Sequence, residues 1–149
     1  MAKHLRTQIR EATATALASL TTTGSNVFES RVYSFAVTTL PSLVIYTKSE
    51  TVAPDTVRAA DGLMRRLDLV IEGYAKSDTA TLDDTLDEIN KEVEIALAAV
   101  PTLGGLCLDQ YLRTVDIDLT AEGETPAGVI TMIFEVTYRT LATAPDAAA

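Results

Sequence analysis

The stretch GVITMIFEVTYRT, residues 128–140, decides the fold that the sequence predicts. Apolar side chains stand at every second position of this stretch, which is the period of a β-strand. A strand with one continuous apolar face must be covered by another layer, so the segment is predicted to belong to a sheet packed against helices. The residues of this face are Ile130, Met132, Phe134, Val136 and Tyr138.

The opposite face of the same strand is mixed, because it carries the apolar Ile133 beside the charged Glu135. A second predicted strand, around Val70, is also apolar on both faces. Two explanations remain open. The centre of the sheet is covered on both sides, for instance by the segment Thr51–Gly62, or part of the second face contacts another subunit.

Outward from this strand, the pattern predicts two amphipathic helices and four more strands, with Thr51–Gly62 as a loop. Two such helices can cover one face of a sheet of about five strands. The predicted fold class is therefore α+β, a two-layer sandwich of a mostly antiparallel sheet with both helices on one face, in the order α-β-β-β-α-β-β. The helices are predicted at residues 5–20 and 81–101, and the other strands at 26–35, 40–49, 63–77 and 107–120.

Composition narrows the class of protein. A chain of 149 residues with 22% charged side chains is typical of a globular protein, and we predict one domain at residues 1–142 with a disordered tail at 143–149. The net charge of -9 argues against a nucleic-acid-binding surface, which needs cations for the phosphates. Cys107 is the single cysteine, so no intramolecular disulfide can form. No stretch is apolar for the roughly 18 residues that span a membrane, so an intracellular soluble protein is expected.

Few residues suggest catalysis. His4, the single histidine, lies close to the N-terminus, where a catalytic triad is not expected. Asp116 and Asp118 lie on one face of a predicted strand, about 7 Å apart, and could hold a divalent cation if Glu122 or Glu124 supplied a third ligand. The polar face of an amphipathic strand requires the same alternation, and we favour that interpretation. No cofactor is predicted.

Several stretches together resemble a known family. They are the N-terminal amphipathic helix, NVFESRVYSF, LPSLVIYT, LDLVIEGYAKS with LDDTLDEINKEVEIAL, and the closing DIDLTAEGETPAGVITMIFEVTYRT. In the order of its predicted elements and in these stretches of sequence, from about His4 to Thr140, the chain resembles the tail terminator proteins of long-tailed bacteriophages, the minor tail protein U-like family.

The resemblance implies a structural function without catalytic residues. Proteins of this family form a ring, typically a homo-hexamer, which caps the growing tail tube and stops its polymerisation. The ring implies three partners: further copies of the chain, the tail tube protein, and a head-completion or connector protein. DNA would pass through the channel without specific binding, and the protein would reside in the tail or neck of the virion.

Two other functions stay open at this stage. One is another neck or tail-completion protein, or the tail tube subunit itself. The other is a small metal-dependent hydrolase that uses Asp116, Asp118 and Glu122. Under the tail-terminator hypothesis the candidate subunit or partner interface comprises Glu122, Glu124, Ile133, Glu135 and Val70.

Overall fold

The computed structural model describes residues 2–29, 40–76, 81–120 and 127–149. Within these ranges two helices pack on a mixed five-stranded sheet of strand order β1-β2-β3-β5-β4, which confirms the predicted α+β class and element order. All strand pairs are antiparallel except β1 with β2. The elements are α1 (Leu5–Ala16), β1 (Val27–Phe28), β2 (Ser42–Pro54), β3 (Leu63–Lys76), α2 (Leu82–Ala98), β4 (Asp109–Thr120) and β5 (Ala127–Thr140).

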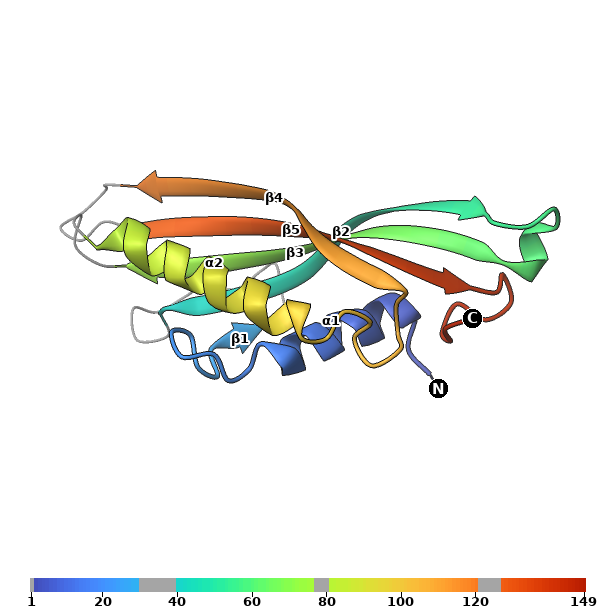
Figure 1. Cartoon of the computed structure of the whole chain (residues 1–149), viewed down its shortest axis with the longest axis horizontal. Helices are drawn as coiled ribbons and strands as arrows, with labels where there is room; N and C mark the ends of the chain where they lie inside the picture. Colours follow the sequence, from blue (N-terminus) through green and yellow to red (C-terminus); the bar gives the residue numbers. More distant parts are fainter. Residues whose placement is uncertain (1, 30–39, 77–80, 121–126) are drawn as a thin grey trace.

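Both helices lie on one face of the sheet (Figure 1), α1 against β2 and α2 against β3 and β5. The predicted apolar face of β5 is buried beneath them, as is the predicted apolar stripe of α2 from Leu82 to Leu97. Gly73 of β3 allows this close approach, since a Cβ there would lie 2.8 Å from Cγ2 of Ile89. Neither helix is long and apolar enough to cross a membrane, as far as the described residues extend.

The segment Thr51–Gly62 is only partly the loop that the sequence predicts, because its first four residues are strand. β2 continues to Pro54 and pairs with the start of β3, and a 3-10 turn at Ala59–Asp61 closes the hairpin. Arg139, at the end of β5, holds this closure through an ion pair with Asp55 and a 2.7 Å hydrogen bond to the carbonyl of Asp61. This part of the strand lacks an alternation of apolar and polar residues because both of its faces are exposed from Thr51 to Pro54.

Two further predictions concern the C-terminal tail and the strand at 26–35. The tail 143–149, predicted to be disordered, is held where Pro145 and Asp146 accept hydrogen bonds from Leu5 and Gln8. The first bond satisfies the backbone N–H of Leu5, which lacks a partner within the helix, and the second comes from the side-chain amide of Gln8. Of the predicted strand 26–35, residues 27–28 form β1, and the part beyond Glu29 lies outside the described residues.

Candidate assembly surface

β4 lies at the edge of the sheet and, in the described ranges, pairs with β5 alone. The sequence predicts a half-buried strand here, but its three central apolar side chains are exposed. Val115, Ile117 and Leu119 keep 39%, 48% and 48% of their surface accessible, and we refer to them as the β4 strip. An open edge beside an apolar surface is a template for association with another chain.

The β4 strip lies on the helix-covered side of the sheet. Ile117 stands opposite the buried Ile130 in the β4–β5 register, and Leu119 stands opposite Gly128. A Cβ on Gly128 would lie 2.8 Å from Leu119 and 2.9 Å from Leu86 of α2, so these two leucines converge above the glycine. The strip is therefore an extension of the hydrophobic core that the two described helices leave largely exposed.

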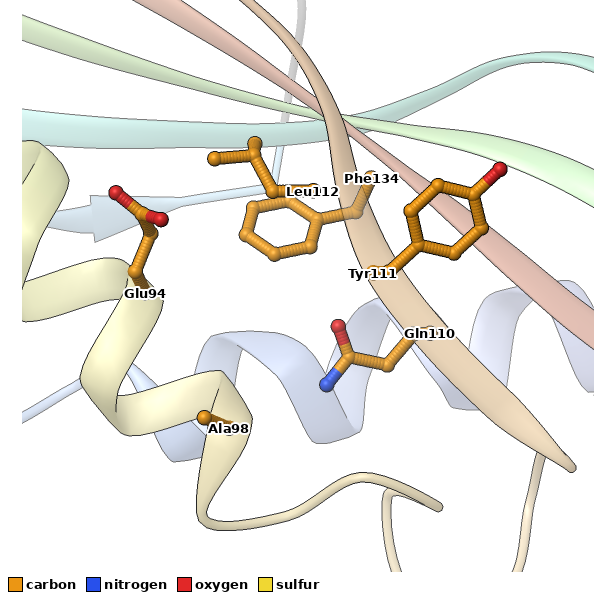
Figure 2. Close-up of a pocket in the computed structure, with 6 residues that line it drawn as sticks. All are labelled: Glu94, Ala98, Gln110, Tyr111, Leu112 and Phe134. Atoms are coloured by element: carbon orange, nitrogen blue, oxygen red, sulfur yellow. The ribbon is translucent and has the colours of Figure 1, made fainter.

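A shallow pocket of about 260 Å³ lies between α2 and β4 (Figure 2). Its apolar part includes Leu112 and Phe134, which are opposite each other in the register, and Glu94 lines its helix side. Gln110 closes one end of the gap by donating a 2.7 Å hydrogen bond to the carbonyl of Leu97. The pocket offers an apolar surface with one carboxylate at its rim. Such a pocket can accept an apolar side chain of another protein.

The other face of the sheet carries a polar cluster that ties β4 to the strands beside it. Arg113, in the irregular part of β4, bonds Asp68 of β3 at 2.6 Å and lies 3.5 Å from Glu135 of β5. Tyr111 also donates a 2.9 Å hydrogen bond to Glu135. The hydrogen bond from Arg113 holds the pKa of the Asp68 carboxyl below its usual value, with a smaller contribution from Ser49.

The structure brings three of the predicted interface residues together on this face. Val70 pairs with Ile133 in the β3–β5 register, and Glu135 follows two positions along β5. Val70 is only 1% exposed and so offers almost no contact area, whereas Ile133 is partly exposed and Glu135 is engaged by Tyr111. Glu122 and Glu124 lie outside the described residues.

The carboxylates of the hydrolase hypothesis are exposed on β4. Asp116 and Asp118 share the face opposite the helices, paired with Thr131 and Val129. Among the described residues, no three side chains of His, Cys, Asp or Glu come together as a metal site. Glu122, the third predicted ligand, is not among them. His4 is the N-cap of α1, where its Nδ1 accepts a 3.0 Å hydrogen bond from the amide of Arg6.

A buried ionic cluster joins α1 to the sheet. An irregularity between Thr47 and Glu50 turns Glu50 toward the helices, where Arg6 and Arg65 bond it at 2.9 and 3.0 Å. The hydroxyl of Tyr138 donates to the same carboxylate, and burial, followed by this hydrogen bond, raises the pKa of Tyr138. The cluster of one carboxylate between two guanidiniums therefore fastens α1 to β2 and β3.

Comparison with known proteins gives likenesses to solved structures at low sequence identity. No protein-family model and no curated protein matches the chain. Among solved structures, a chain of the "Virion of native gene transfer agent (GTA) particle" is similar with a TM-score of 0.47 and 15% sequence identity, over 88% of this chain and 94% of that chain. A likeness of this strength does not assign a function.

Proposed function

We propose that this chain is a structural protein of a bacteriophage virion, a tail terminator. Copies of it form a ring that caps the tail tube, stops tube polymerisation and presents a surface to head-completion proteins. The proposal starts from the resemblance in sequence between His4 and Thr140. The exposed β4 edge with its apolar strip is the structural observation that carries it.

This edge is unusual for a protein that acts alone. Exposed edge strands are normally shortened, covered or kept polar, because they promote pairing with other chains. β4 has 12 residues, and its strip extends the core but remains exposed beside α2. A second copy of the chain would cover the strip and relieve this exposure, as the closed interfaces of homo-oligomers do.

The distribution of charge suits a ring through which DNA passes. Between Thr81 and Thr120 the chain has nine acidic and two basic side chains, so α2, β4 and their connection carry most of the net negative charge. Acidic surfaces repel phosphates and give no counterion-release term that would retain DNA. In the proposed role DNA passes through the ring without being bound, and the negative charge of the protein agrees with this.

Deletion of the gene in the phage that encodes it tests the proposal. Without a terminator, tube polymerisation has no stop, and we expect overlong tails without heads in electron micrographs of the lysate. Wild-type protein supplied from a plasmid should restore tails of uniform length. Normal tail lengths after deletion would overturn the proposal, and long tubes formed by the purified chain alone would favour a tube subunit instead.

A further inference from the structure

We infer that neighbouring copies contact one another head to tail, with the β2–β3 arm of one copy lying on the β4 strip of the next. The arm is the part of the hairpin formed by residues 51–66. This inference rests on the proposed function, because it names the contact between copies within the ring. Each copy would supply one arm and one strip.

The arm is built as a projecting contact element. It extends past α1 at the end of the molecule away from α2 (Figure 1). Val57 at its tip is fully exposed, and Val52 is exposed on the same side of the sheet as the β4 strip. The bonds from Arg139 to Asp55 and to the carbonyl of Asp61 fix the tip before any partner binds, which lowers the entropic cost of association.

The charges of the two surfaces are complementary. Arg58 and Arg66 are exposed on the arm together with one acidic residue, Asp61, while Asp55 is neutralised by Arg139. Glu94 lines the pocket on the same side of the sheet as the β4 strip, and Asp116 and Asp118 add negative charge on the opposite face of the same edge strand. Opposite charges around an apolar contact steer the encounter and fix its orientation.

The arm and the β4 strip of one copy lie too far apart in the fold to contact each other. In the strand order β1-β2-β3-β5-β4, β2 and β4 lie towards opposite edges of the sheet. The tip of the arm and the C-terminal end of β4 point to different ends of the molecule (Figure 1). A contact between two different surfaces leaves a free arm and a free strip after each addition. Such a heterologous contact repeats until the ring closes.

Cross-linking of the full chain tests this geometry. A Val57→Cys/Ile117→Cys double variant, concentrated and treated with a short bis-maleimide, should give a ladder of covalent dimers, trimers and larger species. Val57→Cys and Ile117→Cys alone should stay monomeric on denaturing gels. Native Cys107 is buried, so the treated wild type serves as the blank. A Val57→Cys/Ile95→Cys variant is the matched control, because Ile95 is exposed on α2, outside the strip and the pocket.

A charge exchange provides a second, independent measurement. Arg58→Glu, and separately Glu94→Arg, should each lower the yield of cross-linked ladder by about tenfold, and the combined variant should restore it. A dimer from Ile117→Cys alone, or no ladder from the double variant, would overturn the inference. If no ladder forms while gene deletion still gives overlong tails, only the head-to-tail contact is wrong. A ladder with normal tail lengths would overturn only the tail-terminator function.

Discussion

β4 and β5 are neighbouring strands with the same alternating pattern, but their apolar side chains differ in burial. In β5 every second side chain from Gly128 to Thr140 is buried, and those between are partly exposed. In β4 the apolar side chains of the strip are exposed although they lie on the same side of the sheet. Alternation determines which side chains share a face. The covering layer determines whether that face is buried.

The apolar stripe of α2 is too narrow to cover β4 as well as β3 and β5. The buried stripe of α2 faces β3 and β5, and the helix residues nearest the edge strand include Glu94 and Ala98 beside the pocket. A carboxylate at this position would have to be desolvated to pack on an apolar strip, which is unfavourable without a partner charge. The fully buried core therefore ends at β5, and β4 is held by its backbone pairing, by Leu112 and Gln110 on the helix side, and by the polar cluster on the other face.

Truncating one isoleucine in each strand tests this comparison with the largest expected effect. Ile130 and Ile117 are opposite each other in the register, but Ile130 is 1% exposed. Ile130→Ala should lower the free energy of unfolding by about 2–5 kcal/mol because it leaves a cavity. Ile117→Ala should cost the monomer less than about 1 kcal/mol, as surface changes do. Urea unfolding of dilute protein measures both.

The same pair also separates folding from assembly. At high concentration, Ile117→Ala should weaken self-association measured by sedimentation velocity, whereas Ile130→Ala should act through stability. Equal losses of unfolding free energy in the two dilute variants would show that β4 is as well covered as β5. The comparison of the two strands would then be wrong.

A methyl group added to a glycine in each region should have a smaller effect. At Gly73 the new Cβ would meet Cγ2 of Ile89 at 2.8 Å and Cγ2 of Ile130 at 3.0 Å. These branches lie next to the backbone and cannot turn away, so Gly73→Ala should destabilise the protein by about 1–3 kcal/mol. At Gly128 the neighbours are the far ends of Leu119 and Leu86, and Leu119 is exposed.

Because Leu119 can move into solvent, Gly128→Ala should cost less than Gly73→Ala in thermal unfolding. Neither glycine has a positive φ, so the difference reports packing alone. A larger loss at Gly128 would indicate that the edge of the core is packed as tightly as its centre.

The sequence predicts the elements whose residues face a continuous core. The stripe of α2 and the apolar face of β5 follow from spacing alone, because burial imposes a period on them. The arm and the exposure of the β4 strip do not follow. Residues 51–54 are exposed on both faces, so nothing imposes alternation there, and they form a strand through backbone pairing with β3.

The candidate site was predictable only in part for the same reason. Val70, Ile133 and Glu135 do share a face, as a period of two requires, but the burial of Val70 depends on its neighbours in space. The bond from Arg113 to Asp68 joins residues 45 positions apart and leaves no local pattern. Only the order of strands in the sheet brings these two residues together.

The polar cluster gives the smallest and last expected effect, a change in acid stability. Arg113 holds the pKa of Asp68 below its unfolded value, so the stabilisation is present above about pH 4 and is lost as the pH falls through the folded pKa. The pair is partly exposed, and its contribution should be below about 1 kcal/mol. Asp68→Asn should therefore be less stable than the wild type at pH 7, and the difference should shrink below pH 4 in urea unfolding. Asp116→Asn, which removes an exposed carboxylate of β4 and leaves the bond between Arg113 and Asp68 in place, is the control. A difference between Asp68→Asn and the wild type that stays constant down to pH 2 would mean that Arg113 does not fasten β4 to β3 through this carboxylate.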